Sequence, residues 1–265
     1  MESQLIVQLG HLLGRAWRVV ATGFCFVISG LVLFFLGLVV LPVLRGLGGG
    51  RAEGELRAQY ATHLACRVGI SLFVFLRVIR VEVQGRERLN SGRLMIANHP
   101  TLIDAILLLS LLPTADCVVK AGHTDNFWLR YTVAAAGYIP NVRGPLLVEE
   151  CVKRLRAGRR VLIFPEGTRS PRGQLGPFAR GAAHIAMGAE LDPIPVTLRC
   201  DPATLSRDVA WWRVPDRLPK FTVQVGEPIP IGEAADLSVS RAQASRSVTA
   251  LLQDYFERQI DRGRE

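Results

Sequence analysis

A histidine and an aspartate lie close together in the chain, directly after a short apolar stretch. His99 and Asp104 belong to the run Asn-His-Pro-Thr-Leu-Ile-Asp, which follows the expected strand Leu94–Ala97. A carboxylate bonded to one imidazole nitrogen fixes the tautomer of the ring, so the other nitrogen can take a proton from a hydroxyl. The spacing also suits a helix N-terminus with Thr101 and Asp104 as a capping box. Taken alone, this short pattern favours such a cap beside an ordinary loop histidine.

A second polar turn follows another apolar stretch later in the chain. The run Phe-Pro-Glu-Gly-Thr-Arg-Ser ends the expected strand Val161–Phe164, and strand ends in α/β sheets are where binding sites form. Gly167 permits a tight turn, and Thr168 offers a hydroxyl. Glu166 and Arg169 supply opposite charges, and the guanidinium could bind a phosphate through two parallel hydrogen bonds. A surface turn closed by a Glu–Arg pair is the plainer alternative.

The two motifs, in this order, resemble the signature of the glycerol-phosphate and lysophosphatidate acyltransferase family. Two weaker stretches at 137–143 and 192–196 agree with it, and the resemblance covers roughly residues 81–225. It implies acyl transfer without a covalent enzyme intermediate. His99 would deprotonate an acceptor hydroxyl, Asp104 would orient the imidazole, and the alkoxide would attack the thioester of acyl-CoA or acyl carrier protein. These donors are co-substrates, and the resemblance implies no metal and no other cofactor.

The same resemblance gives the second motif a role in binding the acceptor. Arg169 would hold a phosphate group, and the residues just before it would shape the turn. The leading acceptor is a lysophospholipid, 1-acylglycerol-3-phosphate, whose acylation gives phosphatidate. The implied substrate-binding residues are Glu166, Gly167, Thr168 and Arg169, with Lys120 and Arg143 as helpers.

This chain departs from the family's usual pattern in the region that recognises the acceptor. Thr101 stands where serine is usual, and Gly122 stands where many members carry glutamate. Pro140 and Val142 replace the phenylalanine and aspartate often seen before Arg143. The acyl-transfer residues are unaffected, so these changes leave open only the identity of the acceptor. A lyso-ornithine lipid or another specialised lysolipid is the alternative.

Two other classes of function compete with acyl transfer. A lysophospholipase-type hydrolase normally needs a serine nucleophile on a Gly-x-Ser-x-Gly turn, which the sequence lacks. A non-catalytic lipid-binding protein would need neither motif intact. The net charge of +9 comes from scattered arginines without a basic, aromatic-rich block, so we expect no nucleic-acid partner. Five cysteines without a Cys-x-x-Cys pattern predict reduced thiols, with neither a disulfide framework nor a zinc site.

Short apolar strands alternate with longer helices after residue 80, which predicts an α/β domain. The family resemblance implies a layered αβα arrangement around a mixed central sheet. The expected strands are Val81–Val83, Leu94–Ala97, Cys117–Val119, Val161–Phe164, Ile194–Leu198 and Phe221–Val225. The expected helices are Thr101–Leu111, Asn126–Ala136, Leu147–Ala157, Gly181–Met187 and Ser240–Ile260.

An uncharged segment, Val19–Leu44, lies between two arginines near the N-terminus. As a helix it would be about 39 Å long at 1.5 Å per residue, which exceeds the ~30 Å hydrocarbon core of a bilayer. No signal-peptidase-like site follows it. We therefore expect a membrane-embedded helix, which either crosses the bilayer or bends back at its internal glycines and proline.

The sequence predicts three parts. Residues 1–50 form the membrane anchor and a Gly-rich hinge, residues 51–80 form a helix, and residues 81–265 form the acyltransferase domain. The middle helix fits an amphipathic, interfacial position about as well as a core position. Flanking arginines on both sides of the anchor give no clean orientation. The catalytic argument places the domain on the cytoplasmic face of the inner (plasma) membrane, with membrane lipids as partners.

Overall fold

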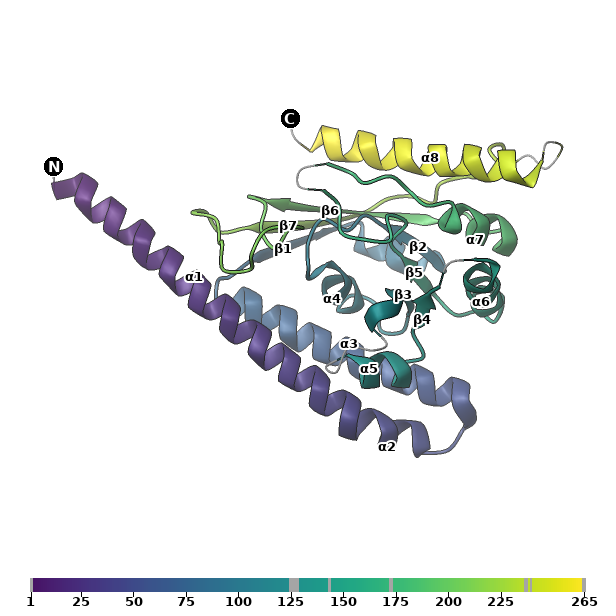
Figure 1. Ribbon diagram of the computed structural model, residues 1–265, viewed down its shortest axis with the longest axis horizontal. Helices are drawn as coiled ribbons and strands as arrows, with labels where there is room; N and C mark the ends of the chain where they lie inside the picture. The colour runs from purple at the N-terminus through teal and green to yellow at the C-terminus, as the bar shows by residue number, and fades with distance from the viewer. Residues whose placement is uncertain are drawn as a thin grey trace.

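The computed structural model describes residues 2–123, 129–142, 144–171, 174–235, 238 and 240–263. A seven-stranded sheet lies between two layers of helices, and a long N-terminal helical hairpin packs beneath one layer (Figure 1). This confirms the expected α/β fold with a long apolar helix before it.

The sheet has the strand order β1-β7-β6-β2-β5-β3-β4. Strands β6, β2, β5, β3 and β4 pair in parallel, whereas β7 is antiparallel to β6 and β1 is parallel to β7. Five strands therefore end at one edge, which we call the carboxyl edge; the opposite edge is the amino edge. The strands are β1 (Arg80–Gln84), β2 (Leu94–Ala97), β3 (Asp116–Lys120), β4 (Ile139–Asn141), β5 (Val161–Ile163), β6 (Ile194–Asp201) and β7 (Lys220–Val225).

The position of β2 in the middle of the sheet explains why its sequence is apolar throughout. All four of its residues are buried, and successive side chains of a strand point to opposite faces of the sheet. Met95 and Ala97 join the core on the face of the hairpin, and Leu94 and Ile96 join the core beneath α7 and α8. A strand covered on both faces has no polar alternation.

All six expected strands are present, with ends that differ by at most a few residues. The seventh, β4, was missed because it has only three residues and includes Pro140. It lies at the edge of the sheet, where a residue without an N–H group is tolerated.

The two helices that follow β2 and β3 are shorter than the sequence predicts, and the three later helices match the prediction to within a few residues. The helix α4 begins at Asp104, not at Thr101, and no capping box forms, because the Thr101 hydroxyl donates to the Asp104 carboxylate. Residues 126–128 of another expected helix lie outside the described residues. The helices are α4 (Asp104–Leu109), α5 (Arg130–Ala135), α6 (Pro145–Arg156), α7 (Gly181–Ala189) and α8 (Arg241–Arg262), with 3-10 turns η2 (Arg86–Asn90) and η3 (Ala121–His123).

The N-terminal hairpin consists of two antiparallel helical arms. The first arm joins α1 (Glu2–Phe35), a π-helical turn η1 (Leu36–Val40) and α2 (Leu41–Gly46), and α3 (Gly50–Phe75) returns beside it. The π turn comes just before Pro42 in the first turn of α2, and proline lacks the N–H that a regular helix requires there. Gly48, Gly49 and Gly50 make the connection at φ near +86°, +85° and +82°, a backbone region that favours glycine.

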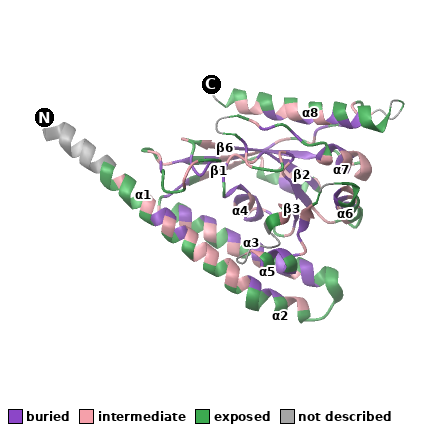
Figure 2. Ribbon diagram, viewed as in Figure 1, coloured by how far each residue is buried: buried purple, intermediate pink, exposed green. Residues whose placement is uncertain are grey.

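The first arm exposes many apolar side chains (Figure 2). Among the described residues, Leu12–Gly46 is the one helical stretch long and apolar enough to cross a membrane. Its mean hydropathy reaches 2.9 over a window of which only 17% is buried. An apolar surface of this extent on a helix indicates membrane association.

Both ends of this arm are bonded to the rest of the chain. Near its start, the Trp17 indole donates to the Leu76 carbonyl at 2.9 Å, and Arg18 donates to the Asp216 carbonyl at 2.8 Å. Near its end, the Arg45 guanidinium donates to the Ala134 carbonyl of α5 at 3.1 Å. The arm therefore lies along the α/β domain and does not project from it as a free helix.

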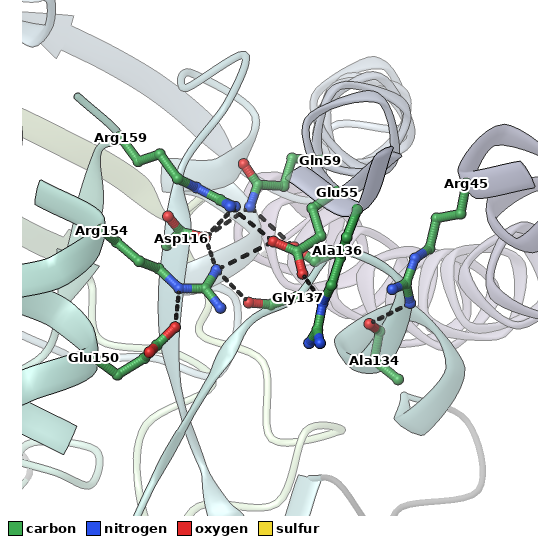
Figure 3. A network of polar contacts seen from close by, with 11 residues as sticks. Arg45, Glu55, Gln59, Asp116, Ala134, Ala136, Gly137, Glu150, Arg154 and Arg159 are labelled. Atoms are coloured by element: carbon green, nitrogen blue, oxygen red, sulfur yellow. Dashed lines mark hydrogen bonds and ion pairs between the residues drawn. The ribbon is translucent and has the colours of Figure 1, made fainter. Parts of the chain in front are cut away.

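A buried network of charges joins the hairpin to the amino edge of the sheet (Figure 3). Asp116, the first residue of β3, accepts hydrogen bonds from Arg154 and Arg159 at 2.6 Å each and from Gln59 of α3 at 2.9 Å. Glu55 of α3 accepts from Arg159 at 2.7 Å. We call Glu55, Asp116, Arg154 and Arg159 the docking network, because it bonds α3 to the elements around β3.

Gly137 fits this network for a steric reason. Its φ is +64°, and a Cβ atom there would lie 2.5 Å from the carboxyl carbon of Glu55. Its carbonyl also accepts from Arg154 at 2.8 Å. A larger residue would displace the carboxylate that joins the hairpin to the domain.

Candidate functional site

The two sequence motifs meet at the carboxyl edge of the sheet. They follow β2 and β5, which are neighbouring parallel strands, so their first residues emerge side by side. The Ser170 N–H donates to the His99 carbonyl at 2.7 Å, and the His99 N–H donates to the Glu166 carboxylate at 2.8 Å. Backbone and side-chain bonds therefore fix one motif against the other.

The imidazole of His99 is held by a buried carboxylate. Its Nδ1 lies 2.8 Å from Oδ2 of Asp104, whose side chain is 0% exposed, whereas the His99 side chain is 20% exposed. The same carboxylate accepts the Thr101 N–H at 2.6 Å and the Thr101 hydroxyl. The ring also stacks on Phe164, with centroids 4.5 Å apart. Together these contacts leave the imidazole little freedom to rotate.

The hydrogen bond determines which ring nitrogen can act as a base. An ionised carboxylate only accepts hydrogen bonds, so Nδ1 of His99 carries the proton and Nε2 keeps its lone pair. Among the described residues, Nε2 has no hydrogen-bond partner. A partly exposed imidazole with a free lone pair and a buried carboxylate behind it can accept a proton from a hydroxyl.

Glu166 occupies the junction between the motifs. Its Oε1 accepts from the His99 N–H and from the Ser170 hydroxyl, each at 2.8 Å, and its Oε2 accepts the Gly176 N–H at 2.8 Å. Burial raises the pKa of this carboxyl, and the three hydrogen bonds oppose the rise only in part. These contacts make Glu166 a residue that positions the loops, and a direct contact with substrate stays a prediction.

The rest of the second turn lies at the surface of the same edge. Gly167 and Thr168 are exposed, and the φ of Gly167 is +65°. Asn141, the last residue of β4, lies beside this turn, because a Cβ on Gly167 would be 3.7 Å from its amide nitrogen. The turn therefore stands open to a ligand.

Arg169 is half-buried and turned towards the segment that follows β6. One of its terminal nitrogens donates to the Leu205 carbonyl at 3.3 Å and to the Ser206 carbonyl at 3.2 Å. A guanidinium has five N–H donors, so these two contacts leave donors for an anion. The sequence contained no motif for this segment, and its contact with Arg169 was not predicted.

The sequence predicts that Lys120 and Arg143 help to bind the acceptor. Lys120 is the last residue of β3, pairs in register with Asn141 of β4, and is exposed at the carboxyl edge. The predicted role of Arg143 falls outside the described residues. No group of three or more potential metal ligands occurs among the residues that the structure describes.

Comparisons with known proteins agree with this geometry. Residues 80–199 match the Acyltransferase family. The chain is 33% identical over 137 residues to a chloroplastic 1-acyl-sn-glycerol-3-phosphate acyltransferase of Brassica napus, covering 49% of this chain and 39% of the relative. It is 30% identical over 135 residues to 1-acyl-sn-glycerol-3-phosphate acyltransferase alpha of Mus musculus, covering 47% of each. The aligned segment thus spans less than half of either relative.

A solved structure shares the fold over nearly the whole chain. The crystal structure of the 1-acyl-sn-glycerophosphate acyltransferase from Thermotoga maritima superposes with a TM-score of 0.70 and covers 93% of this chain and 96% of that chain. The two sequences are 19% identical. This match extends the likeness to the N-terminal helices, which the family match does not reach.

Proposed function

We propose, from the premise that this chain belongs to the Acyltransferase family, that it transfers a fatty acyl group to the free hydroxyl of 1-acylglycerol-3-phosphate and so makes phosphatidate. One observation carries the mechanism: Nδ1 of His99 lies 2.8 Å from the buried carboxylate of Asp104, and Nε2 stays free. The choice of acceptor is supported by the two relatives, which are named as 1-acyl-sn-glycerol-3-phosphate acyltransferases.

The reaction needs one proton to be moved twice. Nε2 of His99 takes the proton from the acceptor hydroxyl as its oxygen attacks the thioester carbonyl of acyl-CoA or acyl carrier protein. Asp104 stabilises the imidazolium that forms. The carbon–sulfur bond then breaks, and the departing thiolate takes the proton from the imidazolium. The histidine returns to its starting state, and no acyl-enzyme forms.

The acceptor's phosphate would bind at the turn beside His99. Arg169 supplies the charged donors, Thr168 supplies a hydroxyl, and Lys120 adds a second positive charge from the end of β3. A guanidinium suits a phosphate because its planar fork of N–H donors can bond two phosphate oxygens at once. A lysolipid with a different headgroup, such as a lyso-ornithine lipid, is the alternative acceptor.

The hairpin would hold the enzyme on one side of the bilayer. Because both ends of the apolar arm are bonded to the same domain, at Asp216 and at Ala134, crossing the bilayer would draw polar parts of the domain into it. We propose that the arm lies in the membrane surface with its exposed apolar side in the hydrocarbon. Soluble acyl donors then reach the carboxyl edge from the cytoplasmic side of the inner membrane.

The test is an acyl-transfer assay with purified protein, both donors and a panel of lysolipids, read by mass spectrometry of the products. His99→Ala should lower turnover by about 10²–10⁴-fold without changing the thermal unfolding midpoint. His184→Ala, on α7, is the matched control and should keep full turnover. Unchanged turnover in His99→Ala would remove the proposed base. Release of free fatty acid with labelling by a fluorophosphonate would instead favour the hydrolase.

A further inference from the structure

The segment between β6 and β7, residues 202–219, carries two adjacent tryptophans on its surface. Trp211 is 39% exposed and Trp212 is 56% exposed. The rings form a row that leads inward: Trp212 to Trp211 at 5.5 Å, Trp211 to Phe26 of α1 at 6.2 Å, and Phe26 to Phe73 of α3 at 5.6 Å. The hairpin thus supports one tryptophan, and the other extends outward.

Two further exposed aromatic residues lie beside the same stretch of α1. Trp17 is 53% exposed, and its indole donates to the Leu76 carbonyl. Phe75, the neighbour of Leu76, is 80% exposed. We call Trp17, Phe75, Trp211 and Trp212 the aromatic patch. Figure 1 shows α1 passing the ends of the strands β1 and β7.

The surroundings of the patch are basic. Exposed arginines without an acidic partner within 4 Å, among the described residues, follow Phe75 and follow the tryptophan pair. Tryptophan prefers the boundary between an apolar phase and water, and arginine is attracted to anionic lipid headgroups. These arginines are Arg77, Arg80, Arg213 and Arg217.

We infer that the aromatic patch is a second bilayer contact, separate from the apolar face of α1, and that it inserts its rings among the headgroups of an anionic membrane. Two observations favour a bilayer over a protein partner. Val20 and Phe24 are exposed and lie three and seven residues after Trp17, on the same face of α1, and the surplus charge around the patch is positive. The inference rests on the proposed membrane association, but not on acyl transfer.

The contact would set the position of the candidate site relative to the membrane. The tryptophan-bearing segment also supplies the Leu205 carbonyl, which accepts the Leu102 N–H at 2.9 Å and a guanidinium N–H of Arg169 at 3.3 Å. The first motif and the phosphate-binding arginine are therefore both bonded to the segment that touches the headgroups. A lysolipid would have to move only from the headgroup layer to the adjacent carboxyl edge.

The experiment measures where single tryptophans lie in a bilayer. The full chain is placed in nanodiscs of phosphatidylcholine with or without phosphatidylglycerol, with Trp212 as its sole tryptophan and the others replaced by phenylalanine. Lipids brominated near the headgroup should quench Trp212 more than lipids brominated deep in the chain, and aqueous iodide should quench it weakly. Two matched variants carry the sole tryptophan elsewhere, at Val27→Trp on the exposed side of α1 and at Arg246→Trp on α8.

The controls separate the possible failures. Val27→Trp should be quenched by deep bromines, and Arg246→Trp only by iodide. If Val27→Trp responds as expected but Trp212 stays open to iodide, the patch does not contact the bilayer and the inference is wrong, although α1 remains membrane-bound. If Val27→Trp also stays open to iodide, membrane association itself fails. Shielding of Trp212 that depends on protein concentration and not on bromine would assign the patch to a second copy of the chain.

A charge-reversal variant provides an independent test. The double variant Arg213→Glu/Arg217→Glu, in the background with Trp212 alone, should lose the extra headgroup quenching that phosphatidylglycerol causes. Its response in pure phosphatidylcholine should match that of the parent. Equal quenching with and without phosphatidylglycerol in the parent itself would overturn the assignment to an anionic surface.

Discussion

The sheet carries a cluster of charged groups at each edge, and the two clusters are built in opposite ways. At the carboxyl edge, Asp104 takes its partners His99 and Thr101 from the five residues before it. At the amino edge, Asp116 takes its arginine partners from distant segments, and those side chains are only 13% and 14% exposed. The first cluster leaves a lone pair open on the imidazole. In the second, positive charge faces negative charge.

The carboxyl-edge cluster meets the requirements of a reaction, whereas the amino-edge cluster meets those of assembling the fold. A general base must keep one acceptor unsatisfied, so its site stays partly open however firmly the ring is held. A buried ion network has little net effect on stability but is costly to break, because removing one partner leaves an uncompensated charge. We expect such a network to fix the position of the hairpin rather than to add stability.

The most direct test of this contrast is to make the same substitution, aspartate to asparagine, at both edges. Asp104→Asn should lower turnover by about 10²–10⁴-fold, because the amide no longer fixes the proton on Nδ1 of His99. Asp116→Asn should lower the thermal unfolding midpoint but leave turnover per folded molecule little changed. Turnover and thermal unfolding of both variants are measured in the same detergent. A loss of turnover in Asp116→Asn at full folding would show that the amino edge takes part in the reaction.

A second prediction concerns the cost of opening the docking network. Arg154→Met removes one of the two arginines that Asp116 and Glu55 share, and should lower the free energy of unfolding by about 3–5 kcal/mol. Replacing all four charged residues of the docking network by methionine or leucine should recover most of that loss, because no charge is then left unpaired. Denaturant unfolding measures both. If the fourfold variant were as unstable as the single one, the charges themselves would be contributing stability.

The sequence predicted the cluster at the carboxyl edge because its parts are local. His99, Asp104 and the second turn each lie directly after an apolar strand, and parallel strands bring their carboxyl ends together. The family resemblance supplied the chemistry and the layered fold. Even so, the predicted capping box was wrong, because the Thr101 hydroxyl donates to the Asp104 carboxylate and does not accept a backbone N–H of α4.

The cluster at the amino edge could not be predicted in this way. Glu55, Asp116 and Arg159 are far apart in the chain, and each alone looks like an ordinary charged residue of a helix or loop. Only the packing of α3 against β3 brings them together. The same limit applies to the Leu205 carbonyl, because every residue has a backbone carbonyl and its residue type does not identify it as an acceptor.

The smallest effect is expected from pH, and it contrasts one carboxyl of the docking network, Glu55, with Glu166 of the candidate site. Hydrogen bonds from Arg159 and Arg51 outweigh the effect of burial and lower the pKa of Glu55 from its usual 4.5. Its contribution to stability is therefore present above that value and lost as the pH falls through the folded pKa. Burial raises the pKa of Glu166 above 4.5, so its contribution is present below that value and lost as the pH rises through the folded pKa.

The measurement is the free energy of unfolding of the wild type, Glu55→Gln and Glu166→Gln across the acidic range. The wild type's advantage over Glu55→Gln should shrink on acidification, whereas its advantage over Glu166→Gln should grow. The comparison uses only the slopes, because each glutamine also changes hydrogen bonds by an amount that does not vary with pH. Slopes of the same sign would mean that burial, and not the arginines, dominates at both glutamates. Glu55 would then no longer differ from Glu166 in the sign of its contribution.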